Sequence, residues 1–190
     1  MYGIEGNIGV GKSTLMKCLS KKYITFEEPL HEWTLLEDFY HDKTNYMFPF
    51  QYQVLLSQFN QLKKIKLLKT QVNNPIFMER NPWSSKNIFL ELIRDSMTSA
   101  EIKCYNKLYN LIDIDITKLF FLNLSPEKCY QRIIQRNRYE ERDIKLDYIK
   151  KLDVQYKKVL CDESCPFKVI MIDVDDKTPE EIMKNIELYI

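Results

Sequence analysis

Glycine is scarce in this chain, and its placement is uneven. Only four glycines occur among 190 residues, and all of them lie within the first eleven positions: Gly3, Gly6, Gly9 and Gly11. A chain this poor in glycine has few backbone positions that need positive φ angles. The concentration at one place indicates a segment where the backbone does something that side chains would obstruct.

Three further shortages narrow the class of protein. The net charge is only +1, so no global field draws the chain to nucleic acid or to an anionic membrane. No apolar run is long enough to span a bilayer, and Met1 leads directly into a strand-like segment without room for a signal peptide. The five cysteines form no C-x-x-C pair, which is typical of reduced thiols. We therefore expect a cytoplasmic protein, in the host cytoplasm if the source is viral, that binds neither nucleic acid nor membrane.

The rest of the sequence alternates between strand-like and helical patterns. Five short apolar runs predict strands at Met1–Glu5, Tyr23–Phe26, Pro75–Glu79, Leu119–Leu124 and Lys168–Asp173. Helical patterns lie at Thr14–Lys22, Tyr46–Thr70, Trp83–Asp95, Ala100–Ile112 (with Ser99 as its N-cap), from Ser125-Pro126-Glu127 onward, at Asp147–Cys161, and from Thr178 onward. This alternation predicts one α/β domain over residues 1–190, a five-stranded parallel sheet flanked by helices. Ligands in such folds bind beyond the carboxyl ends of the strands.

The glycine-rich stretch matches a phosphate-binding loop. Residues Gly6–Ser13 fit G-x-x-x-x-G-K-[ST] and stand between a predicted strand and a predicted helix, as that motif requires. Backbone N–H groups of such a loop surround phosphate oxygens, Lys12 reaches the β- and γ-phosphates, and the Ser13 hydroxyl can ligate Mg²⁺. The residues predicted to hold ATP here are Gly6, Asn7, Ile8, Gly9, Val10, Gly11, Lys12, Ser13 and Thr14. The loop indicates nucleotide binding and leaves the reaction open.

Other nucleotide-binding classes lack their second motif in this chain. A GTPase usually carries D-x-x-G after the loop, and no glycine exists beyond Gly11. The guanine-reading N-K-x-D is also missing, because Asn106–Tyr109 lacks the aspartate. A motor or helicase ATPase would have an apolar strand that ends in Asp-Glu, whereas Val159–Glu163 ends a helical pattern. A kinase of a small acceptor is the class that remains.

Arginine is rare as well, and most of it is concentrated. Four of the six arginines lie in one stretch: Arg132, Arg136, Arg138 and Arg142. Arg132 and Arg136 share one face of a helix, so with Arg138 they can converge on a transferring phosphate. We interpret the stretch as a lid, over about residues 136–144, that excludes water during transfer. A solvated charged helix, paired with neighbouring glutamates, is the alternative.

Charged residues follow the second and third predicted strands. Glu28 is placed to accept the proton of an attacking hydroxyl. Glu79 is a candidate Mg²⁺ ligand together with Ser13, and Arg80 is a candidate contact to the acceptor hydroxyl. The pattern alone leaves an exposed loop glutamate and a surface ion pair open as alternatives.

An acceptor pocket needs flat apolar walls and a few polar groups. Trp33, Tyr40, Phe50 and Phe89 lie near these motifs, although each could equally belong to the core. Gln51 is the polar group beside them. Its amide has both donors and an acceptor, so it can pair with thymine or, after flipping, with cytosine.

Taken in order, these motifs resemble the cellular-type deoxynucleoside kinases, which include the deoxycytidine, deoxyguanosine, mitochondrial thymidine and insect broad-specificity enzymes. The resemblance spans nearly the whole chain, from Ile4 to the last helix. Its motifs are the phosphate loop, Glu-Pro-x-x-x-Trp at Glu28–Trp33, Pro-Phe-Gln at Pro49–Gln51 with Glu-Arg at Glu79-Arg80, and Arg-x-Arg-x-Glu-Glu at Arg136–Glu141.

The resemblance implies a P-loop kinase fold, a homodimer, and transfer of the ATP γ-phosphoryl group to the 5′-hydroxyl of a deoxynucleoside in nucleotide salvage, with Mg²⁺. It implies Glu28 as general base, with Arg80, Lys12 and Arg132 as further catalytic residues. The implied substrate contacts are Glu28, Trp33, Tyr40, Phe50, Gln51, Val54, Gln58, Arg80, Ser85, Phe89 and Glu141. The implied donor contacts beyond the loop are the lid cations Arg132, Arg136 and Arg138, and Asp175, Asp176 and Lys177 near the adenine.

The chain departs from the family pattern at two places. Family members usually have Glu-Arg-Ser, and here Asn81 takes the third position. Members that favour deoxycytidine or purines place an arginine and an aspartate near the base, where this chain has Gln58 and Ser85. With Val54 as a wall, the pocket resembles the thymidine-accepting type, so we expect thymidine, deoxycytidine or both as acceptors.

Two alternative functions stay open at this point. A nucleoside monophosphate kinase, such as thymidylate kinase, would need extra cations for the acceptor phosphate, and outside the lid only Arg80 and Arg94 remain as arginines. A non-catalytic nucleotide-binding interaction domain would bind ATP without turnover, and it would leave Glu28 without a role.

Overall fold

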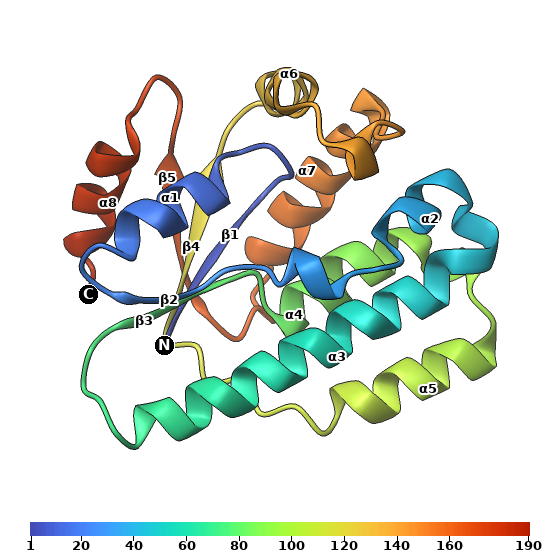
Figure 1. The fold of residues 1–190 in the computed structure, drawn as a ribbon, viewed down its shortest axis with the longest axis horizontal. Coiled ribbons are helices and arrows are strands. Elements are labelled where there is room, and N and C mark those ends of the chain that lie inside the picture. The colour runs from blue at the N-terminus through green and yellow to red at the C-terminus, as the bar shows by residue number, and fades with distance from the viewer.

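The computed structural model describes all residues, Met1–Ile190. Its five strands form one parallel sheet in the order β2-β3-β1-β4-β5 (Figure 1). The strands are β1 (Tyr2–Gly6), β2 (Ile24–Phe26), β3 (Ile76–Glu79), β4 (Lys118–Asn123) and β5 (Lys168–Asp173). The predicted five-stranded parallel sheet is confirmed, and every strand lies within one residue of its predicted bounds.

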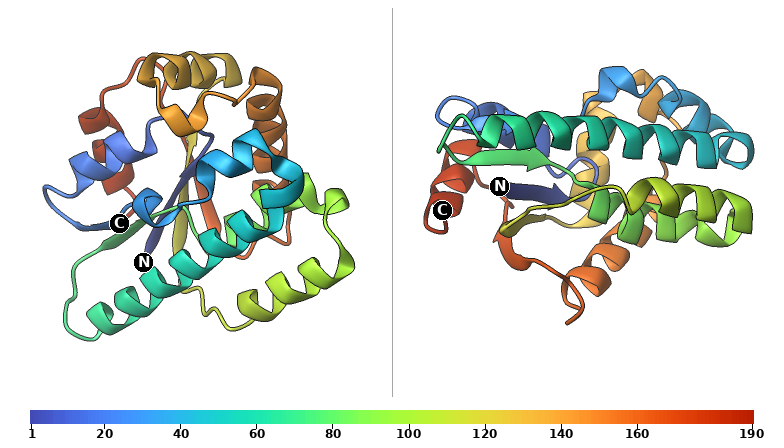
Figure 2. Two further views of the ribbon diagram at one scale, coloured as in Figure 1. Left: turned by 45° about the vertical axis from the view of Figure 1, so that its right-hand side comes forward. Right: turned by 90° about the horizontal axis from the view of Figure 1, so that it is seen from below.

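Helices cover both faces of this sheet. The α-helices are α1 (Lys12–Leu19), α2 (Leu36–His41), α3 (Lys43–Lys69), α4 (Pro82–Ser84), α5 (Ser99–Tyr109), α6 (Pro126–Arg136), α7 (Leu146–Leu160) and α8 (Pro179–Glu187). Shorter helical turns are η1 (Leu30–Glu32), η2 (Ser85–Leu90), η3 (Glu91–Ser96) and η4 (Tyr139–Glu141). Helices α1 and α8 pack together on one side of the sheet, and α3 and α7 lie on the other (Figure 1). Figure 2 shows α3 and α5 side by side.

The core is centred on the neighbouring strands β1 and β4. The largest hydrophobic cluster has 24 buried residues and includes Leu119–Leu122 of β4 together with Ile149 and Leu152 of α7. Each such side chain contributes roughly 1.5–3 kcal/mol when it is fully buried. This packing fixes the carboxyl end of β1, where the phosphate loop begins, beside the carboxyl end of β4. None of the helices combines the length and the apolar character that a membrane crossing requires.

Local capping explains several helix starts. Ser125 accepts a hydrogen bond from the Lys128 backbone, with Pro126 in the first helical position. Thr178 opens α8 with a capping box. The predicted N-cap Ser99 is wrong, because Thr98 takes that role and forms a capping box with Glu101. The sequence therefore carries the correct signal one residue earlier than we placed it.

The predicted single helix over Trp83–Asp95 is also wrong in type. The segment is one α-turn followed by a π-helix and a 3₁₀-helix. The Asn87 amide donates to the Trp83 carbonyl at 2.9 Å, and Gln155 of α7 donates to the Asn87 carbonyl at 2.9 Å. Side chains therefore occupy carbonyls that a regular α-helix would use, which favours the altered hydrogen-bond pattern.

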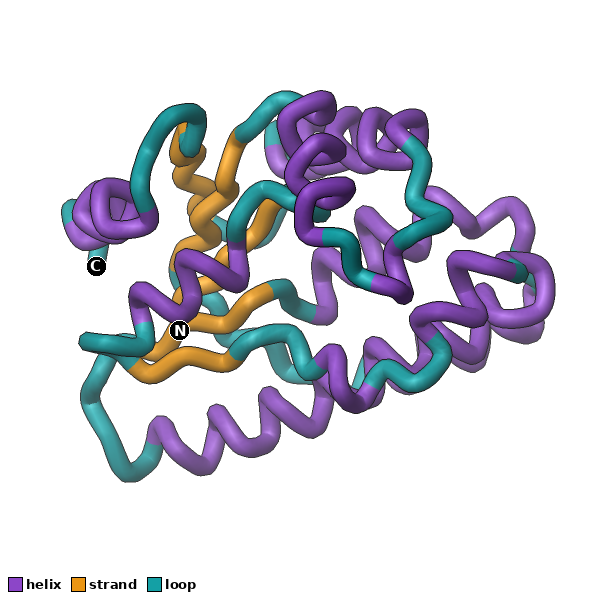
Figure 3. Tube along the Cα trace, turned by 45° about the horizontal axis from the view of Figure 1, so that its top comes forward, coloured by secondary structure: helices purple, strands orange, loops and turns teal.

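The loops after the strands all leave the same end of the sheet (Figure 3). The turn η1 and helix α2, which sequence patterns did not predict, lie on this side between β2 and α3. Helix α2 contacts η4, the turn inside the predicted lid. The elements that follow β1, β2, β3 and β4 thus meet at the carboxyl ends of the strands.

Candidate active site

The phosphate loop runs between the end of β1 and the start of α1, as predicted. Gly9 has φ +81°, and a Cβ atom there would lie 2.3 Å from the Cys129 carbonyl oxygen. A Cβ atom on Gly6, at φ +146°, would lie 2.8 Å from the Leu122 carbonyl oxygen. Backbone packing against β4 and α6 thus requires glycine at both positions, which explains where the scarce glycines stand.

Lys12 lies buried under this loop. Its Nζ donates to the carbonyls of Gly6 at 3.1 Å and Asn7 at 3.0 Å. Burial lowers the pKa of Lys12 to about 8, and the nearby Arg80 adds to the decrease. The Asn7 side chain holds the loop against α7 by donating to the Ile149 carbonyl at 2.9 Å. The loop therefore offers backbone N–H groups and a cation to an anion at one point.

Ser13 and Glu79 form the part of the site that suits a divalent cation. The Ser13 hydroxyl donates to Glu79 Oε1 at 3.1 Å, and Glu79 Oε2 is buried with no hydrogen-bond partner. Burial raises the pKa of Glu79 to about 7, and the neighbouring Glu28 carboxylate adds to the rise. A cation at the unpartnered oxygen would remove that cost. A hydroxyl and a carboxylate, completed by phosphate oxygens, are the ligands that Mg²⁺ prefers.

Glu28 and Arg80 meet at the ends of β2 and β3. Arg80 Nε donates to Glu28 Oε1, and the Arg80 guanidinium carbon lies 4.3 Å from the centroid of the Phe89 ring. Arg80 itself has φ +60°, which is strained for a residue with a side chain, and its backbone N–H bonds to the Ile4 carbonyl at 3.0 Å. The exposed loop glutamate is excluded because the Glu28 side chain is largely buried, and a surface ion pair of Glu79 with Arg80 is excluded because both residues are buried.

Aromatic and aliphatic side chains wall the cavity beyond this pair. The rings of Trp33 and Phe50 meet edge to face with their centroids 5.9 Å apart, and the Phe39 ring stacks on Phe50 with a centroid distance of 4.7 Å. The Trp33 ring N–H is fixed by a 2.9 Å hydrogen bond to Ser57. The Gln51 amide opens onto the cavity without a hydrogen bond inside the protein. The alternative that these aromatics serve only the core is therefore wrong for Trp33, Tyr40, Phe50 and Phe89, which all line the cavity.

Gln58 lies one layer behind this wall. Ser85 lines the cavity, and its hydroxyl donates to Gln58 Oε1 at 2.9 Å. Gln58 is 1% exposed and does not line the cavity. The prediction of a direct substrate contact from Gln58 therefore needs correction, because Ser85 stands between the amide and the cavity.

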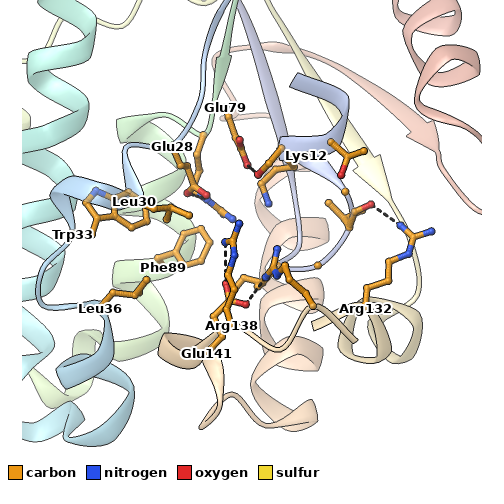
Figure 4. A pocket seen from close by; sticks show the side chains of 18 of the residues that line it. Lys12, Glu28, Leu30, Trp33, Leu36, Glu79, Phe89, Arg132, Arg138 and Glu141 are labelled. Carbon is orange, nitrogen blue, oxygen red and sulfur yellow. Dashed lines mark hydrogen bonds and ion pairs between the residues drawn. The ribbon is translucent and has the colours of Figure 1, made fainter. Parts of the chain in front are cut away.

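The predicted lid cations approach from the opposite side. Arg132 donates to the Val10 carbonyl at 2.9 Å, so it is attached to the phosphate loop. Arg136 and Arg138 both pair with Glu141, and these three side chains line the cavity together with Arg132. Figure 4 shows Arg132, Arg138 and Glu141 at the cavity. Arg132 and Arg136 are exposed and two of the arginines pair with Glu141, as the charged-helix alternative expects, but their place at the cavity goes beyond a helix face that meets only solvent. Figure 4 places Lys12 and Glu79 across the cavity from Trp33, Leu36 and Phe89.

The predicted adenine segment is only partly at the cavity. Lys177 lines it, beside Val174, Pro179 and Ile182. Asp175 forms an exposed ion pair with Lys128 at 2.5 Å, and neither Asp175 nor Asp176 lines the cavity. Of the three residues predicted near the adenine, only Lys177 is therefore at the cavity, and Asp176 between it and Asp175 has φ +53°.

Several residues at the site were not predicted. Leu30, Leu36 and Tyr148 line the cavity, and Glu5 and Tyr156 lie beneath Arg80. A carboxylate in an otherwise apolar strand was the available signal for Glu5. The others lie in segments without a motif. The cavity has a volume of about 420 Å³ and joins the phosphate loop, the Glu28–Arg80 pair and the aromatic wall.

A phosphate loop, a lid with arginines and a parallel sheet of this order define a P-loop kinase. The deoxynucleoside kinase family model matches residues 2–190, so the chain belongs to the deoxynucleoside kinase family. The kinase-named protein 029R of Invertebrate iridescent virus 3 is 37% identical to this chain, and the match covers 97% of this chain and 92% of the viral protein. The thymidine kinase of Ictalurid herpesvirus 1 is 29% identical over 99% of this chain and 85% of its own.

A solved structure has the same fold over nearly the whole length. The deoxyadenosine kinase from M. mycoides with bound dATP superposes with a TM-score of 0.81 at 26% identity, covering 98% of each chain. Named relatives thus act on different bases, and the family alone does not specify the base for this chain.

Proposed function

We propose that this protein transfers the γ-phosphoryl group of ATP to the 5′-hydroxyl of a deoxynucleoside. The observation that carries the proposal is that the phosphate loop and the Glu28–Arg80 pair line the same cavity. Lys12 and Ser13 of the phosphate loop lie at one end, and the buried Glu28–Arg80 pair faces them. A phosphate loop alone would serve any nucleotide-binding protein, whereas a buried carboxylate beside it gives an acceptor hydroxyl its base.

In this proposal Glu28 accepts the proton of the 5′-hydroxyl as that oxygen forms a bond to the γ-phosphorus and the bond to the β,γ-bridging oxygen breaks. Arg80 holds the Glu28 carboxylate in place. Lys12 and Arg132 lie beside the loop, where charge spreads over the phosphoryl oxygens. Mg²⁺, held by Ser13 and Glu79, would neutralise charge on the β- and γ-phosphates.

The acceptor end fits a planar base and a sugar. Trp33, Phe50 and Phe89 offer ring faces and edges, and Gln51 offers an unpartnered amide between them. We propose thymidine and deoxycytidine as preferred acceptors, because one amide that can flip matches either pyrimidine edge. Tyr40 and Glu141 lie at the lid side of the cavity, where they would bind the 3′-hydroxyl.

The lid and the oligomeric state follow from the same proposal. Residues 136–144 would close over the phosphates, which requires Arg136 and Arg138 to exchange Glu141 for the substrate. Resemblance to the family supports a homodimer, which analytical ultracentrifugation would test. Apart from the lid, the phosphate loop and Arg132, which is bonded to that loop, the cavity is lined by two cations, Arg80 and Lys177. Because Arg80 is paired with Glu28, this lining disfavours an acceptor that already carries a phosphate.

The deciding experiment is an ADP-release assay with Mg-ATP and five acceptors: thymidine, deoxycytidine, deoxyadenosine, deoxyguanosine and dTMP. We expect turnover with the nucleosides, highest with a pyrimidine, and none with dTMP. Turnover with dTMP alone would make the protein a monophosphate kinase. ATP binding without any turnover would support an interaction domain.

A further inference from the structure

A buried carboxylate lies directly beneath the proposed catalytic pair. Glu5, in β1, is an acidic residue that has no exposed surface. Its Oε1 accepts hydrogen bonds from Asn81 Nδ2 at 2.9 Å and from the Ser84 hydroxyl, and its Oε2 accepts one from the Tyr156 hydroxyl at 3.0 Å. Burying a carboxylate this deeply costs free energy unless hydrogen-bond donors compensate for the lost water.

The Tyr156 hydroxyl connects Glu5 to the catalytic pair. Arg80 Nη1 donates to the Tyr156 oxygen at 2.6 Å, while Arg80 Nε donates to Glu28. The direction of this chain is fixed by chemistry. Because a guanidinium has donors only, Tyr156 must accept from Arg80 and give its own proton to Glu5. Glu5, Tyr156, Arg80 and Glu28 therefore form one line of hydrogen bonds from the sheet to the cavity.

Glu5 also holds the backbone of Arg80. The Arg80 residue is in the left-handed region at φ +60°, and strain of this kind persists only where the surroundings enforce it. The next residue, Asn81, donates its amide to Glu5 and caps α4 with its side-chain oxygen. One carboxylate thus fixes Arg80 at two points, through Tyr156 at the guanidinium and through Asn81 at the backbone.

We propose that Glu5 and Tyr156 are positioning residues, which aim the Arg80 guanidinium so that the Glu28 carboxylate faces the acceptor hydroxyl. This inference rests on the proposed function, since it assigns Glu28 the role of base. Burial raises the pKa of the Tyr156 phenol well above its usual range, so the hydroxyl keeps the proton that it donates. Neither residue reaches the cavity, so neither touches the substrate.

The test compares two buried tyrosines that lose the same atom. Tyr156→Phe removes the bridging hydroxyl and keeps the ring, which packs against Phe121 and Phe89. Tyr105→Phe is the matched control, because the Tyr105 hydroxyl is buried without a partner in a separate hydrophobic cluster. We expect Tyr156→Phe to lower kcat by about tenfold to hundredfold, the effect of losing a hydrogen bond to a charged group. The KM for ATP should stay unchanged, and Tyr105→Phe should match the wild type in both constants.

Glu5→Gln provides a second variant with the carboxylate's shape. It replaces one acceptor oxygen by an NH₂ group and also removes the negative charge of the ionised carboxylate, so we expect the same selective fall in kcat. A double-mutant cycle then separates positioning from general damage. In the Glu28→Gln background, Tyr156→Phe should change the residual kcat by less than about threefold, because both act through one carboxylate. Full additivity in this cycle would overturn the proposal.

Failure of this inference is distinguishable from failure of the proposed function. If the wild-type protein turns over deoxynucleosides and Tyr156→Phe equals Tyr105→Phe, only the positioning role is wrong. If the wild-type protein binds ATP but phosphorylates no acceptor, the proposed function is wrong and this inference falls with it. Far-UV circular dichroism and thermal unfolding of each variant identify any loss of kcat that comes from unfolding.

Discussion

The carboxylate of Glu28 and the guanidinium of Arg80 form an ion pair that is nearly removed from solvent, with side-chain exposures of 13% and 7%. Removing one partner of such a pair has a larger effect than a surface pair would have. The pair also joins two segments that are 52 positions apart, the loop after β2 and the end of β3.

Glu28→Gln should remove most turnover while ATP still binds. The amide cannot accept the acceptor's proton, and loss of a general base lowers kcat by roughly 10²–10⁴-fold. Steady-state kinetics and calorimetric titration with ATP measure the two effects, and Glu28→Ala should behave alike. Glu27→Gln, a change at the exposed neighbouring glutamate, is the control. If Glu28→Gln keeps activity within a few-fold of wild type, Glu28 is not the base.

Gln51→Ala should raise the KM for the nucleoside more than the KM for ATP. The amide has no partner inside the protein, so its hydrogen bonds are available only to a ligand in the cavity. Losing them should raise the nucleoside KM by about tenfold. Gln71→Ala, an exposed position beyond the end of α3, is the control. Equal increases for both substrates would contradict the assignment of Gln51 to the base.

Gly9→Ala should destabilise the protein and abolish ATP binding. The new methyl group would lie 2.3 Å from the Cys129 carbonyl oxygen, and φ is +81°. Backbone strain of this kind costs about 1–3 kcal/mol, and the displaced loop would lose its phosphate geometry. Gly3→Ala is the matched control, because its Cβ atom would meet only side chains, the nearest at 3.4 Å. Urea denaturation and ATP titration compare the two, and a stable Gly9→Ala protein that binds ATP normally would refute the packing argument.

Glu79→Gln should change how stability depends on pH in EDTA without nucleotide. The pKa of Glu79 is raised from 4.5 to about 7 by burial and by Glu28. The native state therefore binds more protons than the unfolded state between these values, so the wild type should lose stability as pH rises from about 4.5 to about 7. Glu79→Gln removes this contribution, and its stability should fall less over the same window. Urea denaturation at both ends of the window measures the difference, with Glu163→Gln as an exposed control. Parallel pH curves for wild type and Glu79→Gln would contradict the burial argument.

The sequence made the strands and the phosphate loop predictable because their signals are local. Apolar runs and clustered glycines sit within a few residues of the structure that they specify. The lid arginines were also predictable, since Arg132 and Arg136 share a face through helical spacing alone. The two aspartates after β5 show the limit of this reasoning, because Lys177 lines the cavity and its two neighbours do not, a difference that the sequence of the turn does not reveal.

The support beneath the site depends on packing and was therefore not predictable. Glu5 and Tyr156 are 151 positions apart and meet only because α7 packs on the sheet beside β1. Likewise, Gln155 of the same distant helix donates to the Asn87 carbonyl inside the π-helix. Hydrogen bonds of this range leave no period or spacing in the sequence.

The contact between the phosphate loop and α6 has a mechanical consequence. Gly9 lies against the Cys129 carbonyl, and Arg132 donates to the Val10 carbonyl, so α6 contacts the phosphate loop at two residues, Cys129 and Arg132. Helix α6 ends at Arg136, and its C-cap Asn137 has φ +49°, which breaks the helical path. In the proposed closure, the part of the lid that is free to move would therefore be short. It would start after Arg136, would carry Arg138 and Glu141, and would leave Arg132 fixed against the phosphate loop.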